Sequence, residues 1–221
     1  MIKLNFDVKK HILKNGLEVI TIKKNTQISS INIGIKVGAL NETLEEKGIS
    51  HFIEHMIFKG TENRTFQRLN DELESLGGEY NAYTDYSQTV YSISCLEEEF
   101  INGIELLSDM LINSKLPEEE VDKERGVILA EIRSSKDSVE DFSFKRINEV
   151  AFEHSALKYD VAGLDENVKN FTRDQLYSYY KKYYVPNNSL ITMVSSREHD
   201  DAIKEIEKYF GKWQPKEVKS L

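Results

Sequence analysis

The sequence predicts an α+β fold in which a mainly antiparallel sheet carries helices on one face. Two observations indicate this class: the chain begins with apolar and polar side chains in the alternation of strands, and apolar side chains recur at helical spacing in several later stretches. With 221 residues, of which 39% are hydrophobic and 30% charged, the chain can bury a substantial core. It has no internal repeat and no Pro/Gly/Ser-rich linker, so we expect a single domain.

The amino-terminal part is expected to form strands and then a helix. Residues 11–22 predict a hairpin around Asn15-Gly16, because this dipeptide suits a tight hairpin turn. Residues 30–37 alternate and predict the next strand. Gly48 and Ser50 then precede a helix that carries the main motif of the chain.

The middle of the chain is expected to contain a helix over residues 65–76, a strand over residues 81–95 and a helix over residues 97–113. The glycine pair Gly77-Gly78 ends the first of these helices. The last helix has a broad apolar face, which we assign to the core and not to a cofactor site. Cys95 is the single cysteine; it lies in the alternating strand, so a packed position is expected for it and no internal disulfide can form.

The carboxyl-terminal part is expected to be helical apart from one strand. Proline and acidic residues open a helix at residues 117–132, since both are favoured in a first helical turn. Further elements are expected as helices over residues 142–152, 172–180 and 201–209 and as a strand over residues 189–194.

The most informative motif is His51-Phe52-Ile53-Glu54-His55, an H-x-x-E-H pentapeptide. Residues four apart lie one above the other on a helix, so His51 and His55 can direct their rings at one metal ion, with Glu54 beside them. A zinc peptidase needs two imidazoles, a third protein ligand and a carboxylate that takes a proton from water. The pentapeptide alone is also compatible with a solvated helix face.

A third ligand must come from elsewhere in the chain. Glu124 and Glu131 are seven residues apart on the expected helix over residues 117–132, which places both carboxylates on one face. Three other acids lie in the first turn, where the helix dipole favours negative charge, and are interpreted as structural: Glu118, Glu119 and Glu120.

Residues 51–61 resemble the metal-binding helix and exit loop of the pitrilysin-like M16 metallopeptidases, in particular the M16B branch with bacterial and mitochondrial processing peptidases. The resemblance implies that His51, His55 and Glu131 bind Zn²⁺ and that Glu54 is the general base. Glu124 matches a second acid of the family that supports the site without binding the ion.

Residues 77–86 are similar to the family's glycine pair and following Asn-Ala-x-Thr strand, which borders the active site. The free edge of a strand can bind an extended peptide as an additional strand, so Asn81 and Ala82 are the candidates for substrate binding. Gly77-Gly78 is also explained by the end of a helix, and both interpretations can hold together.

The resemblance implies one repeat of the M16 metallopeptidase (LuxS/MPP-like) fold, with a catalytic domain over residues 1–214 and the start of an interdomain linker or tail over residues 215–221. Family members usually carry two such domains, and the second contributes an Arg and a Tyr to substrate binding that have no counterpart here. Three arrangements remain open: a longer chain cut near Pro215, a half-length subunit that pairs with another chain, or a homodimer of halves.

The remaining aromatic and histidine residues are interpreted as structural. An aromatic helix in the family packs under the sheet, which assigns this role to Tyr177, Tyr179, Tyr180, Tyr183 and Tyr184. His11, His154 and His199 have no partner at ligand spacing.

Charge and termini exclude some classes of function. The net charge of −9 argues against a nucleic-acid-binding protein. The first residues do not resemble a secretory signal, and no apolar run has the length of a membrane span, so a cytoplasmic location is expected.

The leading hypothesis is a zinc endopeptidase that hydrolyses peptides or unfolded, presequence-like segments and that pairs with itself or with a second M16-type domain or subunit. The alternative is a non-catalytic or conditionally active peptide-binding or assembly subunit of an M16 heterodimer. Retention of all the motif residues favours catalysis.

Overall fold

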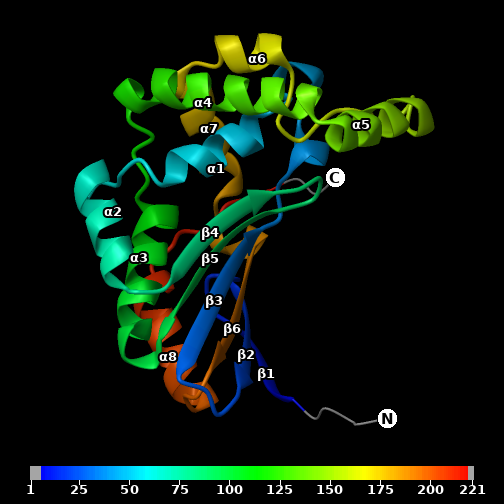
Figure 1. Ribbon diagram of the computed structural model, residues 1–221. Coiled ribbons are helices and arrows are strands. Elements are labelled where there is room, and N and C mark those ends of the chain that lie inside the picture. Colours follow the sequence, from blue (N-terminus) through cyan, green and yellow to red (C-terminus); the bar gives the residue numbers. More distant parts are fainter. Residues whose placement is uncertain (1–5, 219–221) are drawn as a thin grey trace.

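A computed structural model describes residues 6–218 and places a six-stranded sheet at the centre of the molecule (Figure 1). The strands lie in the order β1-β2-β6-β3-β5-β4, and their bounds are β1 Asp7–Ile12, β2 Glu18–Lys23, β3 Ile28–Ile35, β4 Glu79–Thr84, β5 Thr89–Leu96 and β6 Ser189–Ser195. All neighbouring pairs are antiparallel except β2 and β6. The mainly antiparallel sheet predicted from the sequence is therefore confirmed.

The first hairpin forms where it was expected. β1 and β2 pair from Asp7 with Lys23 to Ile12 with Glu18, and Gly16 in the connecting turn has a φ of 87°. This left-handed conformation explains the glycine, because other residues adopt it at a cost.

The expected strand over residues 81–95 is wrong in one respect: it is two strands, β4 and β5, joined by a turn. Asp85 makes the turn, since its Oδ1 accepts hydrogen bonds from the backbone N–H groups of Ser87 (2.6 Å) and Gln88 (2.9 Å). The backbone N–H of Asp85 also donates to the carbonyl of Gln88 at 2.8 Å. An aspartate that bonds its own following backbone is a common turn signal, which the alternating pattern on either side concealed.

The helices form two groups (Figure 1). Their bounds are α1 Ile49–Ile57, α2 Phe66–Ser75, α3 Phe100–Ile112, α4 Glu118–Asp137, α5 Val139–Ala151, α6 Asp165–Asn170, α7 Arg173–Tyr183 and α8 His199–Phe210. Helices α3 and α8 cover one face of the sheet, and α2 packs beside α3. Helices α1, α4, α5, α6 and α7 gather at the end of the sheet where β4 finishes. The short helix α6 was not predicted, because six residues show too little periodicity.

The core begins between the sheet and the α3–α8 layer and continues among the helices at the end of the sheet. Along β3, Ser29, Ile31, Ile33 and Ile35 are buried and alternate with less buried residues on the other face. Cys95 is buried on the covered face, as expected, and four of the five clustered tyrosines are buried; Tyr177 is half-buried.

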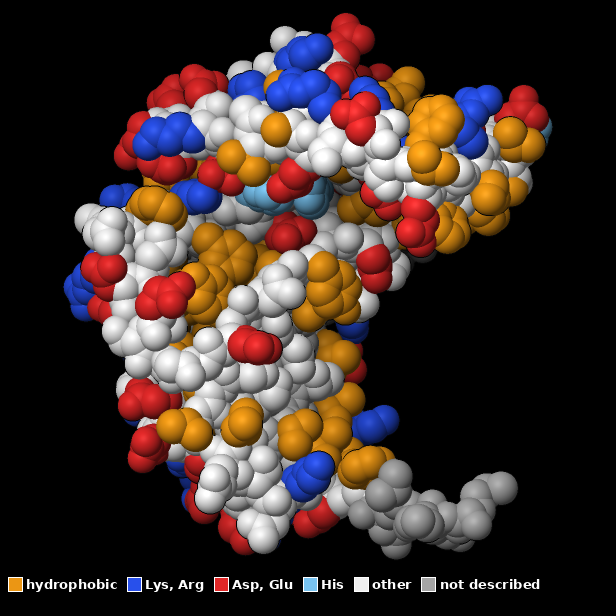
Figure 2. Space-filling model, viewed as in Figure 1, with side chains coloured by type: hydrophobic (Ala, Val, Ile, Leu, Met, Phe, Trp, Pro, Cys, Tyr) orange, Lys and Arg blue, Asp and Glu red, His pale blue; other side chains and the backbone are white. Residues whose placement is uncertain are grey.

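Two apolar surfaces are left uncovered in the described residues. The open face and outer strands of the sheet expose Val8, Ile12, Ile28, Tyr83 and Leu96. Helix α5 projects from the molecule, buries none of its residues and exposes Val139, Phe142, Phe144, Ile147 and Val150. Figure 2 shows apolar side chains gathered over this projecting helix.

The carboxyl-terminal segment continues against the domain. Trp213 is buried against Phe210, and the Asn187 side chain donates to the carbonyl of Lys216 at 2.7 Å. Residues 219–221 of the expected linker lie outside the described residues, as do residues 1–5. Among residues 6–218, no helix combines the length and hydropathy needed to cross a membrane.

Candidate metal centre

Helix α1 presents two imidazoles to one point. The rings of His51 and His55 lie one turn apart, with centroids 4.7 Å apart and planes at 75°. The amino terminus of α1 is held by Glu42, a buried residue upstream of the helix. Its Oε2 accepts from the Gly48 N–H at 3.0 Å and its Oε1 accepts from the Ser50 N–H at 2.9 Å. A carboxylate at this end of a helix satisfies free N–H groups and complements the helix dipole.

Helix α4 crosses α1 and brings the third donor. Oε2 of Glu131 lies 3.7 Å from Nε2 of His51 and 3.6 Å from Nε2 of His55. One donor atom from each of the three residues lies within 4.8 Å of the others. Two zinc bonds at a tetrahedral angle separate their donor atoms by roughly 3.4 Å, so the arrangement needs only small movements to close on an ion.

Glu124 supports His55 from the side away from this point. Its Oε2 lies 3.1 Å from Nδ1 of His55, and its Oε1 accepts from Nζ of Lys59 at 2.6 Å. Burial acts to raise the pKa of Glu124, but the hydrogen bonds from His55 and Lys59 outweigh it and hold the pKa below its ordinary value. An ionised carboxylate only accepts, so Nδ1 of His55 carries the hydrogen and Nε2 keeps its lone pair for a metal.

The pKa values of the two histidines are shifted in opposite directions. Burial, helped by the neighbouring His55, lowers the pKa of His51 to about 4, so this ring is neutral at pH 7. Burial also acts to lower the pKa of His55, but the hydrogen bond to Glu124 and the charges of Glu131 and Glu54 raise it. Without a metal the site therefore favours a proton on His55, which a metal ion must displace.

A metal ion fits these residues. Two nitrogens and one carboxylate oxygen form the ligand set of many catalytic zinc sites. Nδ1 of His51 is buried and has no hydrogen-bond partner among the described residues. Its other nitrogen, Nε2, faces the carboxylate of Glu131 at 3.7 Å and is the nitrogen that is free to coordinate a metal.

Glu54 lies beside the donors and is held from the sheet. Thr84, the last residue of β4, donates its hydroxyl to Oε2 of Glu54 at 2.6 Å. Burial raises the pKa of Glu54, although Thr84 and the charge of His55 act to lower it. A raised carboxylate pKa suits a group that must accept and return a proton near neutral pH.

The two substrate-binding candidates have different orientations on β4, which is an edge strand. Hydrogen-bonded pairs alternate along an antiparallel ladder, and the Asp85 N–H to Gln88 bond fixes the phase. Ala82 and Thr84 therefore direct their backbone groups to the free edge, whereas Asn81 directs its backbone to β5. The Asn81 side chain accepts from the Ala82 N–H at 2.9 Å. This contact shows that the Ala82 donor is accessible from the edge.

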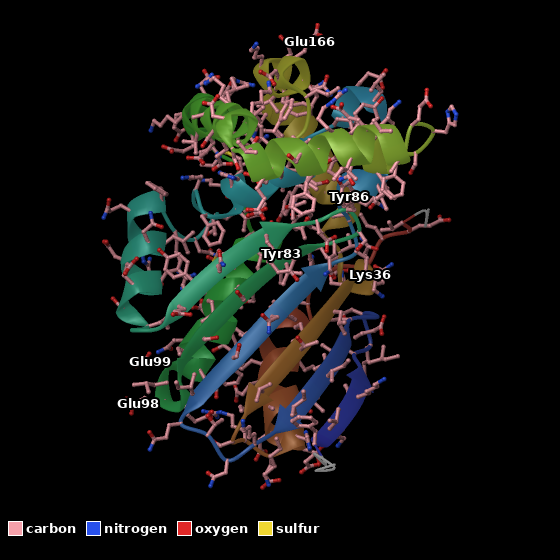
Figure 3. The ribbon with its side chains drawn as sticks, turned by 45° about the vertical axis from the view of Figure 1, so that its right-hand side comes forward. Lys36, Tyr83, Tyr86, Glu98, Glu99 and Glu166 are labelled. Carbon is pink, nitrogen blue, oxygen red and sulfur yellow. The ribbon has the colours of Figure 1, made fainter. Side chains whose placement is uncertain are left out.

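Hollows lie on both sides of the donors. One of about 360 Å³ is lined by Glu54, His55, Phe58, Asn81 and Ala82, among others. Another of about 540 Å³ is lined by His51 and Glu131 and extends beneath α5. Figure 2 shows the histidines recessed between the helices and the sheet. Tyr86 lies below α5 (Figure 3), where its hydroxyl accepts from Asn148 at 3.2 Å.

The structure thus brings together all the residues that the resemblance assigns to the site: His51, His55, Glu131, Glu54, Glu124, Asn81 and Ala82. It adds Glu42, Lys59 and Thr84, which sequence reasoning did not assign. Thr84 was inside the Asn-Ala-x-Thr pattern, but only the fold shows that its hydroxyl reaches the base. The other histidines stay outside the site, and His199 begins α8, where it contacts Thr21 and Asp7.

The fold and this arrangement are of the kind found in zinc metallopeptidases. A family model described as Insulinase (Peptidase family M16) matches residues 18–165, and one described as Peptidase M16 inactive domain matches residues 170–220. The chain belongs to peptidase family M16. The resemblance stated from the motifs is confirmed.

Relatives agree with this assignment. An uncharacterized zinc protease of Rickettsia bellii is 35% identical over 210 residues, which cover 95% of this chain and 50% of the relative. A probable mitochondrial-processing peptidase subunit beta of Arabidopsis thaliana is 33% identical over 90% of this chain and 38% of its own length. The structure of a protease from Helicobacter pylori superposes with a TM-score of 0.92 at 25% identity, over 97% of this chain and 52% of that one. The chain spans about half the length of the Rickettsia bellii protease and a smaller share, 38%, of the length of the processing peptidase subunit.

Proposed function

We propose that this chain is the metal-binding half of a zinc endopeptidase that cleaves peptides or unfolded, presequence-like segments. One observation carries the proposal. The donor atoms of His51 and His55 on α1 and of Glu131 on α4 converge on one point, and Glu54 lies next to it. The family membership supports it, since the relatives include proteins named as zinc proteases.

The residues have distinct roles in this proposal. His51, His55 and Glu131 hold the ion, and Glu124 fixes the hydrogen on His55. The chemistry that zinc supplies when bound is to make a water molecule more acidic and to polarise the scissile carbonyl. Glu54 takes the proton from that water and later passes it to the leaving amine.

The peptide binds as an extended strand along β4. The free backbone groups of Ala82 give main-chain hydrogen bonds that do not depend on the substrate sequence. The side chain of Asn81 must release the Ala82 N–H when a peptide carbonyl replaces it. Because the strand must be extended to pair in this way, unfolded segments are preferred over folded domains.

A second M16-type domain or subunit completes the enzyme. The relatives are about twice as long as this chain, and one is named as a subunit of a processing peptidase. The uncovered apolar surfaces on the open sheet face and on α5 offer contact area for such a partner. We also propose that the second unit can be another copy of this chain, which would give a homodimer of halves. Residues 1–214 are proposed as one catalytic domain and residues 215–221 as a linker or tail. The cytoplasmic location stays a prediction.

The alternative function is a peptide-binding or assembly subunit with no turnover of its own. It is supported by the exposure of the site in the described residues, where the Glu131 side chain is 46% exposed to water. The retained base and ligands favour catalysis, since a scaffold gains nothing from a partly buried polar cluster.

The test is cleavage of an unstructured, internally quenched fluorogenic peptide by the purified zinc-loaded chain. The Glu54→Gln variant should bind zinc in equal amount but cleave nothing. Activity that is equal in both proteins would contradict the proposed mechanism. If both are silent, the assay is repeated with the carboxyl-terminal half of a relative added as a separate chain; silence there would favour the assembly function.

A further inference from the structure

Glu54 is a half-buried carboxylate with one side-chain hydrogen bond among the described residues, the bond from Thr84. A base must present one oxygen to the proton that it takes, and a carboxylate that rotates freely presents that oxygen only part of the time. The Thr84 hydroxyl occupies Oε2, which leaves Oε1 for the reaction. The geometry of this single contact therefore sets how the base is aimed.

We propose that Thr84 is a positioning residue that orients Glu54 and marks the point where the peptide-binding edge of β4 ends at the base. The proposal rests on the proposed function. Thr84 would have two roles: it orients the carboxylate of Glu54, and it sets how far a bound peptide extends along β4.

The first argument is the direction of the Thr84 backbone. Thr84 and Ala82 both direct their backbone groups to the free edge of β4, as the ladder requires. At Thr84 this edge faces Glu54, whose Oε2 accepts from the Thr84 hydroxyl at 2.6 Å. Helix α1 contacts β4 at this end. A peptide strand can therefore pair with Ala82 but stops at Thr84, where the base replaces it.

The second argument is the rigidity of the strand end. Asp85 follows Thr84 and is locked in its turn, and the carbonyls of Asp85 and Tyr86 accept from the N–H groups of Ala39 (3.1 Å) and Leu40 (2.8 Å). Gly38 lies so close to this turn that any Cβ would overlap the Asp85 carbonyl. Because this turn is held on both sides, the backbone of Thr84 has little freedom to move. A residue that positions another side chain needs such a rigid support.

The third argument is that Glu54 is the nearest acceptor for the Thr84 hydroxyl among the described residues, at 2.6 Å. In residues 6–218 its one other acceptor in hydrogen-bond range is Oγ1 of Thr89, at the longer distance of 3.5 Å, and Thr89 donates its own hydrogen to the Val37 carbonyl at 3.0 Å. The hydrogen of Thr84 is thus committed to Glu54. Its methyl group, in contrast, fills space that a valine fills equally well.

The experiment compares Thr84→Val, which keeps the shape and loses the hydroxyl, with Thr84→Ser, which keeps the hydroxyl. Ser94→Ala is the matched control: it removes a hydroxyl from the same hairpin, where Ser94 donates to Ser30 and does not contact Glu54. Zinc content and thermal unfolding are measured for all variants, so that a folding defect is seen directly. In the peptide assay, Thr84→Val should lower kcat by roughly 10- to 100-fold with KM changed less than threefold, while Thr84→Ser and Ser94→Ala stay near wild type.

A second readout needs no turnover. The visible absorption of the Co²⁺-loaded chain would report on the groups around the donors His51, His55 and Glu131, and Glu54 lies beside these donors. The spectrum of Thr84→Val should move away from wild type and that of Thr84→Ser should not. A Thr84→Val protein that keeps the wild-type spectrum and kcat would overturn the proposal. If the wild-type chain cleaves no peptide even with the carboxyl-terminal half of a relative added, the proposed function fails, and the spectra still decide the role of Thr84.

Discussion

Nδ1 of His55 and Oε2 of Glu124 lie 3.1 Å apart, and this contact joins the helix that supplies two metal donors to the helix that supplies the third. Both helices are thereby held in one register around the site. Because Glu124 is also paired with Lys59, the carboxylate stays ionised and the hydrogen stays on the outer nitrogen of His55.

We expect Glu124→Gln to lower zinc affinity by roughly 10- to 100-fold, because an amide fixes the imidazole less firmly than a carboxylate. Competition with a chromophoric chelator measures the affinity. Glu119→Gln is the control, since Glu119 is exposed in the first turn of the same helix. Equal affinities in the two variants would show that Glu124 does not support the ligand.

Glu131→Gln should reduce zinc binding more strongly than Glu124→Gln, since it removes a ligand and not its support. Elemental analysis after dialysis gives the retained zinc per chain. Full zinc occupancy in this variant would contradict the role of Glu131 as the third ligand, whereas full occupancy in Glu54→Gln is the expected result.

Ala82→Pro tests the peptide-binding edge. Proline removes the N–H that faces the free edge, and it is tolerated on edge strands where that N–H makes no ladder bond. We expect KM to rise at least tenfold with zinc content and thermal stability nearly unchanged. Steady-state kinetics with the fluorogenic peptide measure KM; an unchanged KM would place the substrate elsewhere.

Asp109 should make stability depend on pH in the acid range. Burial acts to raise the pKa of Asp109, but hydrogen bonds from Thr61, Asn113, Asn63 and Arg64 hold it below its ordinary value. A lowered pKa in the folded state gives stability that is complete above the unfolded pKa of about 3.9 and is lost as pH falls through the folded pKa.

Asp109→Asn should therefore lower the free energy of unfolding by roughly 2 kcal/mol at pH 7. The difference from wild type should shrink below about pH 4. Urea unfolding at a series of pH values measures it. A difference that stays constant down to the lowest pH would refute the assigned ionisation.

Two glycines should respond oppositely to alanine. Gly163 has a φ of 88°, and a Cβ there would overlap the backbone of Lys47 and Gly48 at the start of α1. Gly126 lies in α4, where a Cβ meets nothing within 4 Å. Gly163→Ala should destabilise the protein and weaken zinc binding, whereas Gly126→Ala should stabilise it by about 0.5–1 kcal/mol. Thermal unfolding of both variants checks the two signs.

The sequence predicted most of this architecture, because long apolar periodicities and capping residues are local signals. Thr172, for example, was expected to cap a helix, and its side chain accepts from the Gln175 N–H. The candidate metal ligands could be named from helix spacing and the family resemblance, and the structure brings their donor atoms together. The turn at Asp85 was missed, since a four-residue connection inside two alternating runs does not interrupt the pattern.

The supporting contacts were beyond sequence reasoning for a different reason. Thr84 and Glu54 are thirty positions apart, and Glu42 reaches α1 through a loop whose path no periodicity determines. Such contacts depend on how the sheet and the helices are placed relative to one another. They became visible only with the three-dimensional structure.

The position of β6 has a consequence for the order in which the molecule forms. This strand comes from residues 189–195, yet it lies between β2 and β3 near the middle of the sheet. During synthesis, the amino-terminal hairpin and the β3–β5–β4 sheet must wait apart until β6 leaves the ribosome and joins them. Helices α1 and α4 of the candidate metal centre are made before that moment, so a nascent chain can carry His51, His55 and Glu131 while its sheet is still in two pieces.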